Sequence, residues 1–166
     1  MPDFDKLFSA TKENFILYKG KTLVGCDLLF FEDGDRFVIK IEKTNSEWIQ
    51  GVGLFLFGII EIEDLGKKAK DRTVFMENTA PKEISIKLWR DRTNRKQPKR
   101  LPKKGILGIK NVWEIKSLTE HPCVHSWHHG AAMIVEEIEN GRRYRCNDGH
   151  PDDNFDDIVF TIQKVS

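Results

Sequence analysis

The chain has 166 residues, of which 39% are hydrophobic and 32% are charged, and this composition is typical of one soluble globular domain rather than a disordered chain. The 27 Lys and Arg residues nearly balance the 26 Asp and Glu residues, so the net charge of +1 excludes a strong overall attraction to nucleic acid or to a membrane surface. We therefore expect a single domain over residues 1–166 with a hydrophobic core of its own.

The sequence carries no sign of a membrane span or a secretory signal. No apolar run reaches the roughly 18 residues that a span requires, and the start of the chain lacks a basic segment followed by an apolar one. The three cysteines, Cys26, Cys123 and Cys146, are odd in number and irregularly spaced, which does not indicate a disulfide framework. These features predict a cytoplasmic protein, or one that is exported without a classical signal peptide.

Strand patterns dominate the chain after a short N-terminal extension. Residues 1–12 are predicted to form this extension, with one amphipathic helical turn at 3–8. In the segment 37–41, Phe37, Ile39 and Ile41 alternate with Val38 and Lys40, as in a strand with one buried face. The predicted strands are 15–18, 23–31, 37–41, 48–49, 54–62, 73–76, 84–89, 106–115, 131–138, 142–146 and 158–162.

Turn signals join these strands. The segments 32–35 and 139–141 contain the Asp, Asn and Gly residues of tight hairpin turns. About ten short strands with frequent turns, and almost no helical periodicity, predict an all-β protein. The expected architecture is an antiparallel β-sandwich or jelly roll.

A basic segment interrupts the pattern of strands at 90–105. Residues 90–104 carry eight Lys or Arg residues and one acid, together with two prolines, so we predict a long exposed loop. Such a loop is either a solvated connection, which the near-zero net charge favours, or a binding site for nucleic acid or an anionic surface. The run contains no aromatic residue, which argues against base stacking.

Four of the five histidines lie between residues 121 and 129. In an extended chain, side chains at alternate positions share one face, and these would be His121, Cys123, His125, Trp127 and His129. Nitrogen and sulfur ligands of this kind suit Zn²⁺ or Cu²⁺, so a transition-metal enzyme using His121, Cys123, His125 and His129 is one hypothesis. The spacing matches no standard zinc signature, and a polar loop is the alternative.

Acidic and amide side chains crowd the segment between the last two predicted strands. Calcium prefers six to eight oxygen ligands supplied by a pliable loop, and carboxylates this close repel one another unless a cation neutralises them. The sequence therefore predicts a Ca²⁺ site, with a simple polar turn as the alternative. The candidate oxygen donors are Asp148, Asp152, Asp153, Asn154 and Asp157.

The early turn after Phe31 and the late strand–loop–strand segment together resemble short motifs of the bacterial galactose-binding calcium lectins of the PA-IL type. The resemblance covers about 40 residues. It implies that the Phe31 backbone carbonyl, the Asp148 carboxylate and the pair Asp153 and Asn154 bind calcium, and that sugar hydroxyls complete the ion's coordination. It also implies the homo-oligomers through which lectins gain avidity.

The predicted function is accordingly a non-enzymatic, calcium-dependent carbohydrate-binding protein of lectin type. An aromatic ring against the apolar face of the sugar would add specificity, and Trp127 and His150 are the candidates for contacting it. The sequence has no nucleophile elbow, phosphate-binding glycine loop or His-Glu-x-x-His motif. The alternatives are a β-sandwich interaction protein with a structural Ca²⁺ site, and the transition-metal enzyme described above.

Overall fold

The protein folds into one antiparallel β-sheet in a computed structural model that describes residues 3–91, 104–116, 122–126, 130–150, 152 and 154–166. This confirms the prediction of an all-β antiparallel fold. The described elements are α1 (Phe4–Ser9), β1 (Phe15–Tyr18), β2 (Lys21–Val24), β3 (Asp27–Phe31), β4 (Arg36–Thr44), β5 (Ile49–Ile62), the 3₁₀ turn η1 (Glu63–Leu65), β6 (Lys67–Met76), β7 (Glu83–Arg90), β8 (Gly105–Lys116), β9 (Pro122–His125), β10 (Ala132–Ile138), β11 (Gly141–Asn147) and β12 (Ile158–Val165).

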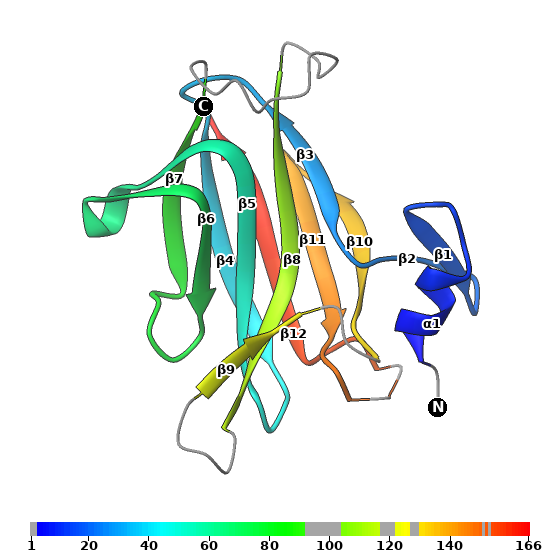
Figure 1. Ribbon diagram of the computed structural model, residues 1–166. Coiled ribbons are helices and arrows are strands. Elements are labelled where there is room, and N and C mark those ends of the chain that lie inside the picture. The colour runs from blue at the N-terminus through cyan, green and yellow to red at the C-terminus, as the bar shows by residue number, and fades with distance from the viewer. Residues whose placement is uncertain (1–2, 92–103, 117–121, 127–129, 151, 153) are drawn as a thin grey trace.

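The layered appearance of the molecule comes from a single sheet that folds over on itself. The strand order is β1-β2-β10-β11-β12-β4-β7-β5-β8-β3, with β6 added to β5 and β9 to β8. Figure 1 shows β5 and β8 in front of β11 and β12. Buried side chains from both parts, among them Leu107 of β8 and Tyr144 of β11, belong to one core. The two layers expected of a sandwich are therefore two regions of one continuous sheet.

Alternation of apolar residues explains which faces of the strands are buried. In β7, Ile84, Ile86 and Leu88 are at most 1% exposed, whereas the residues between them reach solvent to varying degrees. Because successive side chains of a strand point to opposite faces, this strand contributes one face to the core. The same rule holds at the start of β4, where Phe37 and Ile39 are buried.

Two sequence-based boundaries differ from the structure. The predicted strand 23–31 is divided at Gly25 and Cys26 into β2 and β3, which lie at opposite ends of the strand order. Of the predicted strands 48–49 and 54–62, Trp48 lies just before a strand, and Ile49 and residues 54–62 are parts of one 14-residue strand, β5. Tertiary pairing overrides local signals in both places. β2 pairs with β10 whereas β3 pairs with β8, and β5 is long enough to pair with β6, β7 and β8.

The predicted hairpin at 32–35 is wrong, although the turn itself exists. The Glu32 backbone N–H donates to Asp35 Oδ2 (2.8 Å), and Gly34 has the positive φ of 88° that such a turn requires. However, β3 pairs with β8, whereas β4 pairs with β12 and β7. The turn therefore connects the two layers rather than two neighbouring strands. The hairpin predicted at 139–141 is confirmed, because β10 pairs with β11 there.

The N-terminal segment packs on the sheet through a small core of its own. Phe4 of α1 is fully buried beside Ile16, Leu23, Ala132 and Phe155. The helix begins at the Asp3 cap, whose carboxylate accepts a hydrogen bond from the Lys6 N–H. The described chain has no helix with the length and apolar character needed to span a membrane.

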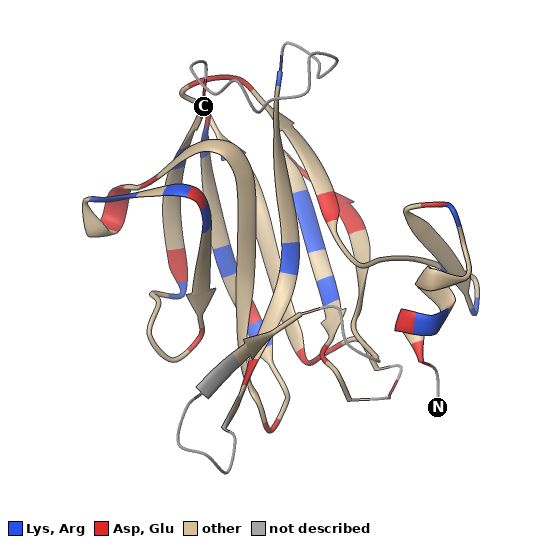
Figure 2. Ribbon diagram, viewed as in Figure 1, with Lys and Arg blue, Asp and Glu red and all other residues tan. Residues whose placement is uncertain are grey.

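Charged residues of opposite sign pair with one another on β4, β10 and β11. Figure 2 shows basic residues of β11 beside acidic residues of β10. Arg145 pairs with Glu136 at 2.6 Å, and Arg143 pairs with Glu42 of β4 at 2.7 Å. Pairs of this kind are partly exposed, so they contribute modestly to stability.

Candidate functional site

Asp148 is the centre of a buried polar network at the end of β11. Its side chain is 0% exposed. Asp148 Oδ2 accepts hydrogen bonds from the Ser46 hydroxyl (2.5 Å) and Gln50 Nε2 (3.0 Å), and Oδ1 accepts one from the His150 N–H (2.9 Å). Ser46 lies in the β4–β5 connection and Gln50 lies on β5, so the network ties three segments of the chain together.

Asp157 lies beside Asp148 and carries a perturbed carboxyl group. Its Oδ2 accepts a hydrogen bond from the Asp148 N–H at 2.9 Å. The pKa of Asp157 is raised to about 7, chiefly by burial and also by the nearby negative charges of Asp148 and Asp152, which together outweigh the lowering effect of that hydrogen bond. Three of the predicted calcium-binding acids therefore lie close enough together to repel one another.

The acidic loop has a fixed backbone on both sides of these carboxylates. The Asn147 side chain donates to the Asp152 carbonyl (2.7 Å) and accepts from the Phe155 N–H (2.7 Å). Phe155 is 3% exposed and has a φ of +53°, which is uncommon for an aromatic residue. Its ring packs 5.8 Å from that of Phe4, so the loop is anchored to the N-terminal core.

Two partly exposed rings stack next to this network. The Trp48 and His150 rings are 3.9 Å apart at an interplanar angle of 17°. The ring of the buried Trp113 of β8 is 6.3 Å from the Trp48 ring and nearly parallel to it, at 12°, and Gly149 lies against both indoles. Sequence reasoning missed Ser46, Trp48 and Gln50, because they are about 100 residues from Asp148 and no local pattern connects them to it.

Phe31 does not belong to this end of the molecule. Phe31 pairs with Gly105 at the first residue of β8, whereas Gly149 approaches Trp113, eight residues further along the same strand. A strand rises about 3.3 Å per residue, so the two points are about 26 Å apart. The Phe31 carbonyl therefore cannot share an ion with Asp148.

The other predicted ligands are distributed as follows. Asp152 Oδ1 accepts a hydrogen bond from the Asn154 N–H at 3.1 Å, and the Asn154 side chain is exposed. His125 lies on β9 opposite Trp113, at the same end of the molecule as the acidic loop. Asp153, Trp127, His121 and His129, the Cys123 side chain, and most of the basic loop at 90–105 lie outside the described residues.

Among the residues that the structure describes, no group of three or more His, Cys, Asp or Glu side chains is arranged to hold a metal ion. Gln50 Oε1 is buried without a hydrogen-bond partner among those residues, and the Gln50 Nε2 donates to both Asp148 and the Trp48 carbonyl. The two acceptors fix the orientation of the amide.

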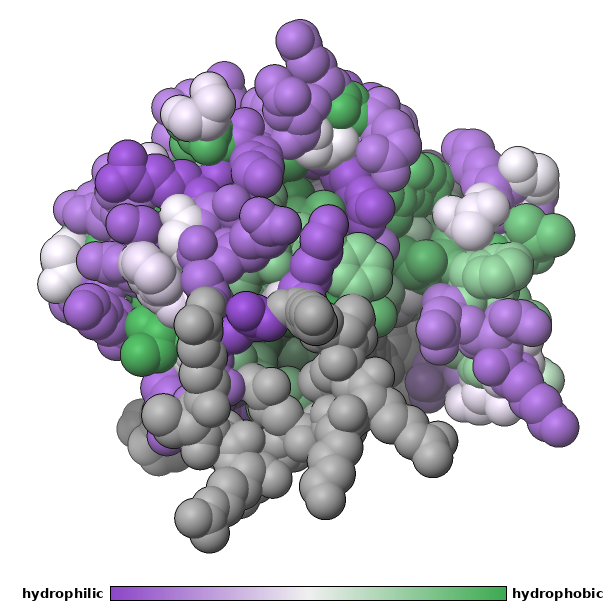
Figure 3. Space-filling model, turned by 90° about the horizontal axis from the view of Figure 1, so that it is seen from above, coloured by the Kyte–Doolittle hydropathy of each residue, from purple (hydrophilic) through white to green (hydrophobic). Residues whose placement is uncertain are grey.

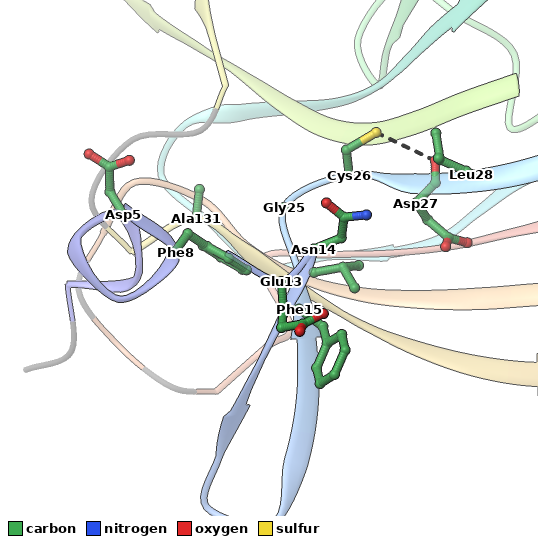
Figure 4. A pocket seen from close by; sticks show the side chains of 11 residues that line it. Asp5, Phe8, Glu13, Asn14, Phe15, Gly25, Cys26, Asp27, Leu28 and Ala131 are labelled. Atoms are coloured by element: carbon green, nitrogen blue, oxygen red, sulfur yellow. Dashed lines mark hydrogen bonds between the residues drawn. The ribbon is translucent and has the colours of Figure 1, made fainter. Parts of the chain in front are cut away.

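A separate cavity of about 590 Å³ lies between the N-terminal segment and β3. Figure 3 shows apolar side chains where the N-terminal segment, at the right of the view, meets the rest of the molecule. Figure 4 shows Phe8 of α1 directed toward the segment that carries Gly25 and Asp27. The cavity is lined by Asp5, Phe8, Glu13, Asn14, Phe15, Val24, Gly25, Cys26, Asp27, Leu28 and Ala131.

Asp27, which lines this cavity, forms hydrogen bonds with side chains of the distant strand β11. Asp27 Oδ2 accepts hydrogen bonds from the Arg142 guanidinium and from the Tyr144 hydroxyl, both at 2.7 Å. Burial raises the pKa of Tyr144, and the charge of Asp27 adds to this effect. The tyrosine therefore stays protonated and donates to Asp27 across the neutral pH range.

Comparison with known proteins adds no relative to this description. No family model matches the chain, and no curated protein or solved structure matches it either. The fold and the arrangement of side chains therefore carry the functional argument.

Proposed function

We propose that this protein is a non-catalytic carbohydrate-binding protein. The sugar would contact Trp48, His150 and the loop 148–157, which lie together at one end of the sheet. The observation that carries the proposal is the Trp48–His150 stack, 3.9 Å between ring centroids, directly beside the Asp148 network. This position differs from the one expected from sequence, because it omits Phe31 and adds Trp48.

The stacked rings and the acidic loop are chemically suited to binding a sugar. A sugar ring has an apolar face, which packs well on a flat aromatic surface, and hydroxyls, which require fixed hydrogen-bonding partners. The stacked rings supply the flat surface, and carboxylates and backbone groups of the acidic loop supply the partners. The Asp148 and Asn147 hydrogen bonds fix described residues of this loop, which lowers the entropy cost of binding.

Calcium is a proposed cofactor of the same site. Apart from the His150 ring, the side chains of this loop that can bind a metal are carboxylates and one amide, and their oxygens are the ligand type that calcium prefers. Burial is the main cause of the raised pKa of Asp157, and the negative charges of Asp148 and Asp152 add to it; a cation would offset those two charges, which supports this idea. Asp148 is already saturated by protein hydrogen bonds, so we assign it to holding the loop rather than to the ion.

A glycan array tests the proposal, first with calcium and then with a chelator. We expect the wild-type protein to bind at least one class of glycan and Trp48→Ala to lose about tenfold or more in affinity, because the stacking surface is gone. The matched control is Trp89→Ala. Trp89 is also partly exposed, but it lies on β7 against Gly34, at the other end of the molecule.

Each outcome of this experiment has a clear meaning. Binding that both tryptophan variants retain would place the sugar elsewhere and contradict the proposed position. No glycan binding with or without calcium would contradict the function itself. Binding that survives the chelator would support the sugar site and remove calcium from it.

A further inference from the structure

The cavity between the N-terminal segment and β3 has the size of a small-molecule site. We propose that it binds a small organic cation with an apolar body, such as an arylalkylamine. Its volume of about 590 Å³ falls within the usual range of ligand pockets, which is roughly 300 to 1,000 Å³. It is independent of the proposed sugar site, since no lining residue belongs to the Trp48–His150 stack or to the acidic loop.

The apolar part of the lining would hold the body of the ligand. Phe8 comes from α1, Phe15 from β1 and Leu28 from β3, so three separate elements contribute to this surface. Leu28 and Phe15 are 48% and 42% exposed, a high exposure for side chains of this size. A ligand that covers them would remove apolar area from water, which favours binding.

The charged residues of the lining determine whether a positively or a negatively charged ligand is favoured. Asp5, Glu13 and Asp27 line the cavity, and no Lys or Arg is among its described lining residues. Arg142 engages Asp27, so Asp5 and Glu13 are the acids left for a ligand. The two phenylalanine rings add to the attraction, because an ammonium group is drawn to the face of an aromatic ring.

Polar groups deeper in the cavity are held in place by the fold. The Cys26 thiol donates a weak hydrogen bond to the Asp27 carbonyl (3.5 Å), as Figure 4 shows. Burial raises the pKa of Cys26 to about 11, so this thiol is neutral at pH 7 and is a poor nucleophile. The lining therefore offers reversible, charge-selective binding rather than covalent capture.

Three matched probes test the charge preference by calorimetry on the full chain. They are 4-phenylbutylamine, 4-phenylbutanol and 4-phenylbutanoate, which share one apolar body and differ in the charge of the end group. We expect the amine to bind about tenfold more tightly than the alcohol, and the carboxylate to bind more weakly than both. Equal binding of all three probes, or no binding of the amine, would overturn the proposal.

Two pairs of variants locate the binding. Leu28→Arg places a cation in the cavity and should abolish amine binding, whereas Leu17→Arg alters an equally apolar but 75% exposed side chain outside the cavity and should not. Glu13→Gln should weaken amine binding severalfold, and Glu47→Gln, at an exposed glutamate outside the cavity, should leave it unchanged. Both glutamates are exposed, so this second pair remains informative if Leu28→Arg does not fold.

The result with the variants is decisive in both directions. Loss of amine binding in Leu28→Arg and Glu13→Gln, with binding kept in Leu17→Arg and Glu47→Gln, would establish the site. Full amine binding by Leu28→Arg or by Glu13→Gln would show that the amine binds elsewhere and would overturn the assignment. Because the sugar site has different residues, neither outcome depends on the carbohydrate proposal.

Discussion

At the scale of single residues, Asp157 makes the stability of the protein depend on pH. Its pKa in the folded protein is about 7, well above the ordinary aspartate value of about 4. The folded state therefore binds this proton more tightly than the unfolded state. The contribution to stability is fully present below pH 4 and is lost as the pH rises to about 7.

Asp157→Asn should remove this dependence, because the amide does not titrate. We expect the unfolding free energy of the wild type to fall relative to that of the variant between pH 4 and pH 7, by about 3 kcal/mol. Urea unfolding at a series of pH values measures the difference. Two parallel profiles would contradict the raised pKa.

At the scale of one element, β8 illustrates how glycines accommodate aromatic rings from neighbouring strands. A Cβ atom at Gly105 would lie 2.2 Å from the Phe31 ring, and one at Gly108 would lie 2.2 Å from the Phe55 ring. Phe31 is 2% exposed, so its ring has no room to move, whereas Phe55 is half-buried and can turn toward solvent. The two glycines therefore differ in how well they tolerate a methyl group.

Gly105→Ala should destabilise the protein by about 1 to 3 kcal/mol, as overpacking in a core does. Gly108→Ala, on the same strand, should cost clearly less. Denaturant unfolding of the two variants gives both values, and a larger loss for Gly108→Ala would refute the argument from ring mobility.

At the scale of the whole molecule, Asp27 joins two distant parts of the folded sheet. It begins β3, the last strand in the sheet order, and it binds Arg142 and Tyr144 of β11, which belongs to the other half of that order. The three side chains are largely buried, so their hydrogen bonds are stronger than those of surface ion pairs.

Asp27→Asn should reduce the unfolding free energy by about 2 to 4 kcal/mol, because it removes the buried anion and leaves the partly buried Arg142 charge only the exposed Glu137 as an ionic partner. Glu42→Gln is the matched control, since Glu42 pairs with the neighbouring Arg143 at the surface, and its loss should be smaller. Thermal unfolding of both variants measures the difference. Equal losses would show that Asp27 does not act as the closing contact.

Local patterns predicted most strands and the all-β class, because alternation and turn residues depend on neighbours in the chain. Phe37 and Ile39, for example, are buried as the alternation predicts. The break of 23–31 into β2 and β3 was not predictable from local sequence. The strand is interrupted at Gly25 and Cys26 only because β2 pairs with β10 and β3 pairs with β8, and both partners are distant in the chain.

The candidate sites, too, were determined partly by local sequence and partly by tertiary structure. Sequence alone determined that oxygen-bearing side chains crowd residues 148–157, since crowding is a property of the local chain. Only the tertiary structure decided that Phe31 lies about 26 Å from them and that Ser46, Trp48 and Gln50 lie beside them. It also created the cavity at Leu28, whose walls come from segments that share no sequence pattern. The physical reason is that strand pairing brings together residues about 100 positions apart, and the folding of the whole sheet determines which residues meet.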